Sequence, residues 1–341
     1  MVNRRKWIGI TVGAGATLGL TPRLLQALQQ GQLIKRAIPS TGEMLPVVGL
    51  GSSATFSQVA RSEELTALKE VIKTMVERGA TVFDTAPSYG ASEQVAGAIA
   101  NELGVANKIF WATKVNVVDR GGGGTADPAA ARAQIEASFA KFKVPKIDLM
   151  QVHNLADVPT QLGILKELKR AGRIRYLGVT TTSDRQYGQL ETIMRNEPLD
   201  FIGVDYAADN RGVEETILPL AIQRKIGVLV YVPFGRTSLF RRAEGKELPE
   251  WAKEFDATTW AQFFIKYVVS HPAVTAVTPA TSQARHMIDN IGGGIGRLPN
   301  EATRKRMAEF VDALPPAPPR GGRSGAPPAG GTTPPPVRPP V

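Results

Sequence analysis

The chain has 341 residues, of which 43% are hydrophobic and 21% charged, so it fits neither a fully disordered chain nor a collagen-like fibre. It contains no cysteine and three histidines, which excludes disulfide frameworks, thiolate metal sites and cysteine nucleophiles. The formal net charge is +10, which taken alone suggests a nucleic acid or an anionic membrane as partner.

The basic excess is concentrated at the two ends of the chain. Residues 1–32 carry four basic and no acidic side chains, and residues 315–341 carry three basic and no acidic ones. Only +3 of the total is left for residues 33–314. We therefore expect no nucleic-acid partner. The alternative, a nucleic-acid-binding protein, rests on the high isoelectric point alone. It predicts that the protein still binds DNA after both ends of the chain are removed.

Residues 1–32 have the pattern of an export signal. Arg4 and Arg5 precede an apolar run that ends near Leu20 and is too short to span a bilayer, which takes ~20 residues. The paired arginines resemble a twin-arginine export signal, with Asn3 where Ser or Thr is usual. We expect the export machinery as a partner and a periplasmic or exported location. The alternative is a cytoplasmic protein with a basic start.

Between the ends, apolar β-rich runs alternate with helical patterns. After a predicted hairpin in the segment 33–45, the predicted strands lie at 47–51, 81–85, 109–114, 147–153, 175–180, 201–206, 227–232 and 275–279. The helical patterns that follow them lie at 62–78, 92–102, 128–141, 159–170, 184–195, 214–224, 258–270 and 282–291, with an extra helix at 299–314.

Eight strand–helix units in a row predict an α/β protein with a (β/α)8 TIM barrel, whose bottom the hairpin plugs. The alternative is an open doubly wound sheet, but the glycine-rich phosphate loop that it needs after the first strand is missing. The chain is thus predicted to divide into an export signal with a linker at 1–32, a barrel at 33–314 and a tail at 315–341. The tail is rich in Pro, Gly and Arg, has few apolar side chains to bury, and is predicted to be disordered.

Polar side chains gather where three successive strands of this barrel end. Asp84 lies at the end of strand 81–85 with Tyr89 just beyond, Lys114 ends strand 109–114, and His153 ends strand 147–153. Taken singly, these residues would be read as a loop cap, a packing tyrosine, a solvated lysine and a hydrogen-bonded histidine. Because TIM barrels place their chemistry at the carboxyl ends of the strands, the four together predict a catalytic site.

The sequence around these residues is similar to the aldo-keto reductase superfamily, over about residues 38–314. The resemblance implies an NAD(P)-dependent oxidoreductase that transfers a hydride between a nicotinamide cofactor and a small-molecule carbonyl or alcohol. The motifs that carry it are Gly49-Leu50-Gly51, the segment from Asp84 to Gly90 with Glu93, Ala112-Thr113-Lys114, Asp148-Leu149-Met150-Gln151-Val152-His153 and Gly172-Arg173-Ile174-Arg175-Tyr176-Leu177-Gly178.

The resemblance also implies a role for each of the four rim residues. Tyr89 would be the acid/base, Lys114 and Asp84 would tune it, and His153 would orient the substrate carbonyl. A nearby ammonium favours the phenolate, so we expect Lys114 to lower the pKa of Tyr89 from its reference value of about 10. A buried lysine needs a counter-ion, which Asp84 would provide.

The same resemblance implies NADP(H), or alternatively NAD(H), bound in an extended form across the top of the barrel. No metal is expected, and the protein is expected to be a monomer or a weak oligomer. The implied cofactor contacts are Gly51, Ser52, Thr180, Thr181, a stacking Tyr231, Pro233, Phe234, Gly235, Arg236, Ser238, Thr281, Arg285, Asp289 and Asn290.

Two residues on the nicotinamide side depart from the family pattern. Gly203 stands where the family has a carboxamide-binding Gln, and Thr181 stands where it has an Asn. Both departures remove an amide. They motivate an alternative function on the same fold, namely a catalytically weak sensor or pseudo-enzyme that binds a nicotinamide nucleotide.

Overall fold

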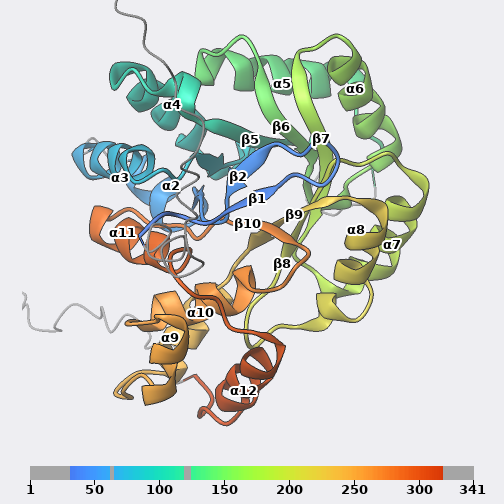
Figure 1. Ribbon diagram of the computed structural model, residues 1–341. Helices are drawn as coiled ribbons and strands as arrows, with labels where there is room; N and C mark the ends of the chain where they lie inside the picture. Colours follow the sequence, from blue (N-terminus) through green and yellow to red (C-terminus); the bar gives the residue numbers. More distant parts are fainter. Residues whose placement is uncertain (1–30, 62–64, 119–123, 318–341) are drawn as a thin grey trace, which may run out of the picture.

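The computed structural model describes residues 31–61, 65–118 and 124–317. Their central feature is an eight-stranded, all-parallel sheet in which every strand pairs with its successor along the chain. Parallel bridges between Val48 and Val277 and between Gly51 and Ala280 join the first strand to the last. The sheet therefore closes into a barrel, which confirms the predicted TIM-barrel class (Figure 1). Its strands are β3 (Leu50–Gly51), β4 (Val82–Asp84), β5 (Phe110–Val115), β6 (Ile147–Val152), β7 (Ile174–Thr181), β8 (Phe201–Asp205), β9 (Gly227–Tyr231) and β10 (Val274–Val277).

Helices surround the barrel because each strand is apolar on both faces and needs cover outside as well as packing inside. Every residue of β5, for example, is buried. Within the described residues the helices are α2 (Thr55–Val59), α3 (Thr66–Glu77), α4 (Ser92–Glu102), α5 (Pro128–Phe142), α6 (Val158–Arg170), α7 (Tyr187–Asn196), α8 (Ile217–Arg224), α9 (Ser238–Arg242), α10 (Trp260–Val269), α11 (Ala284–Gly292) and α12 (Glu301–Asp312).

The amino-terminal end of the barrel is closed by the antiparallel hairpin of β1 (Lys35–Ala37) and β2 (Met44–Pro46), as predicted. Figure 1 shows this hairpin in blue across the amino-terminal end of the barrel. Ile38 and Leu45 of the hairpin are buried in the same cluster as Phe110 and Phe201, which lie near the beginnings of their strands. The hydroxyl of Tyr176 is 3.0 Å from that of Thr41 and donates to Glu43. With this end plugged, the opposite rim is the end open to ligands.

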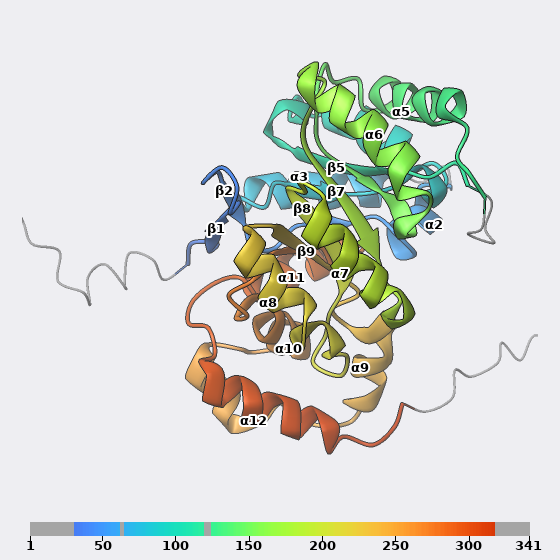
Figure 2. The same ribbon diagram turned by 90° about the vertical axis from the view of Figure 1, so that its right-hand side faces the viewer.

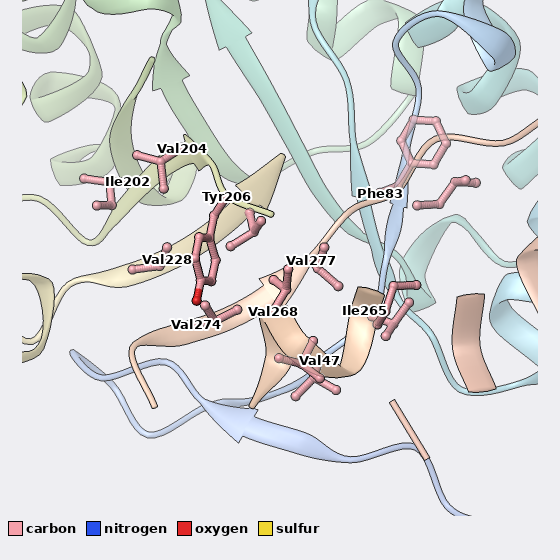
Figure 3. Packing of buried hydrophobic residues seen from close by; sticks show 14 of the residues in the cluster. Val47, Phe83, Ile202, Val204, Tyr206, Val228, Ile265, Val268, Val274 and Val277 are labelled. Atoms are coloured by element: carbon pink, nitrogen blue, oxygen red, sulfur yellow. The ribbon is translucent and has the colours of Figure 1, made fainter. Parts of the chain in front are cut away.

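The last helices form a second layer on one side of the barrel. Ile265 and Val268 of α10 lie beside Val274 and Val277 of β10, in the same buried cluster (Figure 3). Beyond α10 lies α12, which Figure 2 shows along the bottom edge of the molecule. The extra helix expected at 299–314 is thus present and packs on the outside of the barrel.

The structure adds short elements that the sequence pattern missed. The stretch after β9, expected as a long loop, contains α9 and a 3-10 turn at Glu250–Phe255, and α2 precedes α3. Elements of five or six residues are too short to show a helical period, which explains the omission. Nearly all of the segment predicted to be an export signal, and nearly all of the tail, lie outside the described residues. Among the described residues, no helix combines the length and apolarity needed to cross a membrane.

Candidate active site

A pocket of about 560 Å³ opens at the carboxyl ends of the barrel strands. Its walls come from the ends of β4, β5, β6 and β7 and from the loops after β3, β9 and β10. All four residues predicted to be catalytic, Asp84, Tyr89, Lys114 and His153, line it. The barrel topology is the reason, because strands adjacent in sequence are adjacent in space and end at the same rim.

Asp84 and Lys114 form a buried ion pair at the floor of this pocket. Asp84 pairs in register with Ala112, so Lys114, two residues further along β5, projects from the same face of the sheet. The Lys114 Nζ donates to Asp84 Oδ1 at 2.9 Å, to Asp84 Oδ2 at 2.8 Å and to the Thr85 carbonyl at 2.8 Å. These three bonds use all three N–H groups of the ammonium.

Tyr89 and His153 lie above the ion pair on two short turns. Tyr89 ends the 3-10 turn Pro87–Tyr89, and His153 begins the turn His153–Leu155. Their rings meet edge to face with centroids 5.9 Å apart, and Lys114 Nζ is 5.5 Å from the centroid of the Tyr89 ring. A phenol, an imidazole and an ammonium therefore surround one small volume, which is the arrangement that general acid–base chemistry on a small polar group requires.

Burial dominates the electrostatics of these groups. It lowers the pKa of His153 to about 3, with a further contribution from Lys114, so the imidazole is neutral at ordinary pH. Burial also raises the pKa of Tyr89 above its usual value, and Lys114 and Arg236 offset this rise only in part. Lys114 acts in the expected direction, but the net shift is opposite to the lowering that the sequence predicted. Tyr89 therefore keeps its proton at neutral pH, as an ordinary tyrosine does, and remains protonated further into the alkaline range.

Tyr231, at the end of β9, reaches across the floor of the pocket to the ion pair. Its hydroxyl donates to Asp84 Oδ1 at 3.1 Å and accepts from Gln151 Nε2 at 3.0 Å. Lys114 Nζ lies 5.0 Å from the centroid of its ring. A Cβ added to Gly203 would lie 2.4 Å from Cε2 of Tyr231. Gly203 therefore provides the space that the Tyr231 ring occupies.

The loop after β9 has an unusual backbone. Val232, Gly235, Arg236 and Thr237 all have φ between 51° and 75°, a region that non-glycine residues seldom adopt. Such conformations cost free energy and cluster at ligand-binding sites, where the surrounding structure holds them. Val232, Arg236 and Thr237 line the pocket, so this strained loop and its guanidinium form one wall.

The residues predicted to contact a cofactor fall into two groups. The pocket lining includes six of them, namely Gly51, Thr180, Tyr231, Pro233, Phe234 and Arg236. Gly51 has a structural reason as well, because a Cβ there would lie 2.4 Å from the Thr278 carbonyl oxygen, where the barrel closes. Outside the lining are Ser52, Thr181, Gly235, Ser238, Thr281, Arg285, Asp289 and Asn290.

Several residues of the second group have protein partners. The Thr181 hydroxyl bonds to Gln186 and Ser183, and Asp289 accepts from Thr259 at 2.8 Å and from Gln262 at 2.9 Å. Further bonds join Ser238 to Asp209, Thr281 to Gln283 and Arg285 to Gln283. Their polar groups are thus engaged in holding the loops around the pocket.

The pocket also contains polar residues that the sequence did not single out for a role. Asn154, Thr182 and Thr278 line it, and the Asn154 backbone amide donates to Thr180 Oγ1 at 3.3 Å. No sequence signal marked them, since each is an ordinary polar residue near a strand end. Within the described ranges, no group of three or more histidine and carboxylate side chains is placed to hold a metal ion.

Similar proteins of known family indicate the family of this chain. The sequence profile of the aldo/keto reductase family matches residues 47–305. The chain is 32% identical to the aldo-keto reductase YhdN of Bacillus subtilis (strain 168), in a match that covers 64% of this chain and 66% of that protein, just under two thirds of its length.

Solved structures share the fold at lower sequence identity. The aldo-keto reductase AKR11C1 of Bacillus halodurans is 21% identical, with a TM-score of 0.65, and the match covers 82% of this chain and 96% of that one. An aldo-keto reductase of Klebsiella pneumoniae, solved in complex with NADPH, is also 21% identical with a TM-score of 0.65 and covers 85% of this chain and 98% of that one.

Proposed function

The chain belongs to the aldo/keto reductase family, and from this premise we propose that it is an oxidoreductase that transfers a hydride between NADP(H) and a small-molecule aldehyde, ketone or alcohol. The observation that carries the proposal is the convergence of Asp84, Tyr89, Lys114 and His153 in one pocket. Membership of the family does not by itself establish this activity, because one fold hosts many activities.

The pocket has a donor set that fits a dinucleotide cofactor. Its volume of about 560 Å³ falls in the range of small-molecule and cofactor sites. Arg236 would attract a phosphate, and Thr180, Thr182 and Thr237 offer hydroxyl groups for the polar parts of the molecule. The NADPH-bound relative supports this assignment. When bound, the cofactor supplies or accepts the hydride.

The chain's own residues manage the proton. In carbonyl reduction, Tyr89 gives its phenolic proton to the substrate oxygen, and the Lys114 ammonium stabilises the phenolate that results. The neutral His153 holds the substrate oxygen by a hydrogen bond and so orients it next to Tyr89. Asp84 keeps the Lys114 charge in place. In alcohol oxidation the proton moves in the reverse direction and Tyr89 acts as the base.

The first experiment separates binding from turnover in the wild-type protein. NADPH is titrated by fluorescence, and its oxidation is followed with a panel of aldehydes that includes the electron-poor 4-nitrobenzaldehyde. We expect saturable binding and turnover. NADPH binding with no turnover of any aldehyde would support the alternative, a nucleotide-binding sensor, which the missing amides at Gly203 and Thr181 favour.

Replacing Tyr89 by Phe should abolish most of the reduction. The variant keeps the ring but loses the proton donor, so kcat should fall at least ~100-fold, as is usual for loss of a general acid. The dissociation constant of NADPH should stay within about two-fold of wild type, because the phenol acts on the substrate. Full activity in Tyr89→Phe would show that the proton comes from another group.

For the cellular location we propose export through the twin-arginine pathway. The proposal rests on Arg4 and Arg5 before an apolar run and on the concentration of basic residues at the chain ends. That pathway carries folded proteins, which suits a protein that takes up its cofactor before export.

A further inference from the structure

Tyr231 is a buried phenol that touches the Asp84–Lys114 pair but has no place in the proton transfer described above. We propose that Tyr231 is a positioning residue for the reaction, and that its hydroxyl holds the Asp84 carboxylate in the orientation that pairs with Lys114. Gly203 and Gln151 are the residues that put this hydroxyl in place. The proposal rests on the proposed oxidoreductase function and assigns a new role within the same site.

The direction of the hydrogen bonds follows from the chemistry of the partners. A carboxylate can only accept, so the Tyr231 hydroxyl donates its single proton to Asp84 Oδ1, at 3.1 Å. A lone pair of the same oxygen is then free to accept from Gln151 Nε2, at 3.0 Å. Gln151 thereby fixes the rotation of the hydroxyl and aims its proton at Asp84.

This bond matters because the ion pair is almost fully buried. The side chains of Lys114 and Asp84 are 1% and 5% exposed, so water cannot replace a lost partner. A buried ion pair stabilises a protein only when additional hydrogen bonds satisfy the charged groups. Asp84 Oδ1 receives two donors, Lys114 and Tyr231. Without the hydrogen bond from Tyr231, the carboxylate would be less restrained in the orientation that gives its bidentate contact with Lys114.

Gly203 and Tyr231 fit each other across two neighbouring strands. Gly203 pairs with Leu229, so Tyr231 is the next residue of β9 on the same face of the sheet. A Cβ on residue 203 would lie 2.4 Å from Cε2 and 2.6 Å from the hydroxyl oxygen of Tyr231. Any larger residue would displace the ring. Gly203 on β8 thus leaves the space in which the Tyr231 ring lies when its hydroxyl reaches Asp84.

The electrostatics agree with the geometry. Burial raises the pKa of Asp84, and Lys114 and the Tyr231 hydrogen bond counteract this rise. Burial raises the pKa of Tyr231 well above its ordinary value, so the phenol remains a donor at every working pH. The titratable groups around Asp84 are Lys114 of β5, Tyr231 of β9, Tyr89 and His153 on the rim turns, and Arg236 of the loop after β9.

The test begins with Tyr231→Phe, which keeps the ring above Gly203 and removes only the hydroxyl. The control is Tyr176→Phe, which removes a tyrosine hydroxyl at the closed end of the barrel, where it bonds to Thr41 and Glu43. Both variants lose hydrogen bonds of a buried tyrosine, so a general loss of stability would affect both.

The first readout needs no cofactor and no turnover. The carboxyl signal of Asp84 is followed by NMR in protein with isotope-labelled aspartate, and is assigned as the signal missing from Asp84→Asn. We expect the pKa of Asp84 to rise in Tyr231→Phe and to stay at the wild-type value in Tyr176→Phe. An unchanged Asp84 titration in folded Tyr231→Phe would overturn the proposal, whether or not the protein proves to be a reductase.

The second readout is kinetic. In Tyr231→Phe we expect kcat for 4-nitrobenzaldehyde to fall roughly ten-fold, the effect of losing one hydrogen bond to a charged group. The acidic limb of the kcat profile should move to higher pH, while the dissociation constant of NADPH stays within about two-fold. Weaker NADPH binding with an unchanged kcat at saturation would overturn the proposal and make Tyr231 a cofactor contact.

A second variant keeps the test decisive if Tyr231→Phe does not fold. Gln151→Met removes the amide that aims the hydroxyl, at similar volume, and should change kcat and the Asp84 titration in the same direction by a smaller factor. The double variant should lose no more than Tyr231→Phe alone, because both act through one hydrogen bond. Independent, multiplying losses would contradict the proposed chain from Gln151 to Asp84.

Discussion

At the scale of single residues, the site is governed by burial more than by charge. The sequence predicted that Lys114 would lower the pKa of Tyr89, and Lys114 does act in that direction. Loss of water around the phenol outweighs it, because desolvation penalises the phenolate. The resting site therefore holds its proton on Tyr89 and carries a neutral His153, the two states that carbonyl reduction needs.

These states predict the pH dependence of the two reaction directions. Carbonyl reduction should show no inflection near the ordinary histidine pKa of about 6.5, because His153 has a pKa of about 3 and stays neutral. Alcohol oxidation needs the Tyr89 phenolate and should rise with pH through the alkaline range, since the pKa of Tyr89 is raised. The measurement is kcat against pH in both directions.

The exposed His286 offers a matched control for that experiment. An inflection near neutral pH that disappears in His153→Gln and persists in His286→Gln would show that His153 titrates there. It would contradict the neutral imidazole assigned to the site.

At the scale of elements, the alternation of strands and helices was predictable because it depends on local periodicity. Helix α4 has the predicted bounds, Ser92–Glu102, and the predicted hairpin closes the barrel. The predicted helix 184–195 begins instead with a 3-10 turn at Asp184–Gln186 before α7. A turn of three residues has the same composition as a helix start, and only its hydrogen bonds distinguish the two.

A partly buried polar cluster joins α12 to the rest of the molecule, in addition to the buried Met307 and Val311 and the ion pair between Arg211 and Asp312. Arg304 of α12 donates to Glu214 Oε1 at 2.7 Å, and the Tyr206 and Tyr267 hydroxyls also donate to this carboxylate. The side chains of Arg304 and Glu214 are 13% and 31% exposed. This cluster therefore contributes directional polar contacts to the packing of α12.

Glu214→Ala should therefore lower the free energy of unfolding by about 2 kcal/mol, since it leaves a mostly buried guanidinium without its carboxylate partner. Urea denaturation measures this change. The control is Glu254→Ala, which removes the partner of Arg306 on the same helix. Both side chains of that pair are more than half exposed, so the loss should stay below about 0.5 kcal/mol. Equal losses in the two variants would contradict a special role for Glu214.

At the scale of the whole molecule, the net charge of +10 describes the ends of the chain more than the barrel. The part that the structure describes places one basic side chain, Arg236, in the wall of the pocket, beside Lys114 on its floor. The basic residues of the first 32 positions belong to the export signal that we propose, and such a signal is recognised by a receptor independently of the fold.

The export proposal predicts that a charge-preserving change abolishes secretion. Arg4→Lys/Arg5→Lys keeps the positive charges but removes the paired guanidinium groups, so the protein should remain in the cytoplasmic fraction. Arg23→Lys, in the same segment but outside the pair, should be exported normally. Immunoblots of cell fractions make the comparison. Export of the double variant at the wild-type level would argue for another route.

The sequence by itself determined the barrel and the four polar residues of its rim. Both depend on features local to the chain, namely apolar periodicity and the residue types at strand ends. Gly203 shows where this reasoning stops. In the sequence it marks a lost amide, whereas in the structure it makes room for Tyr231, whose hydroxyl reaches Asp84 across 147 positions of the chain. The direction of the pKa shift of Tyr89 likewise depends on its burial. Only closure of the barrel decided these features, because it creates both the contacts between distant strands and the exclusion of water.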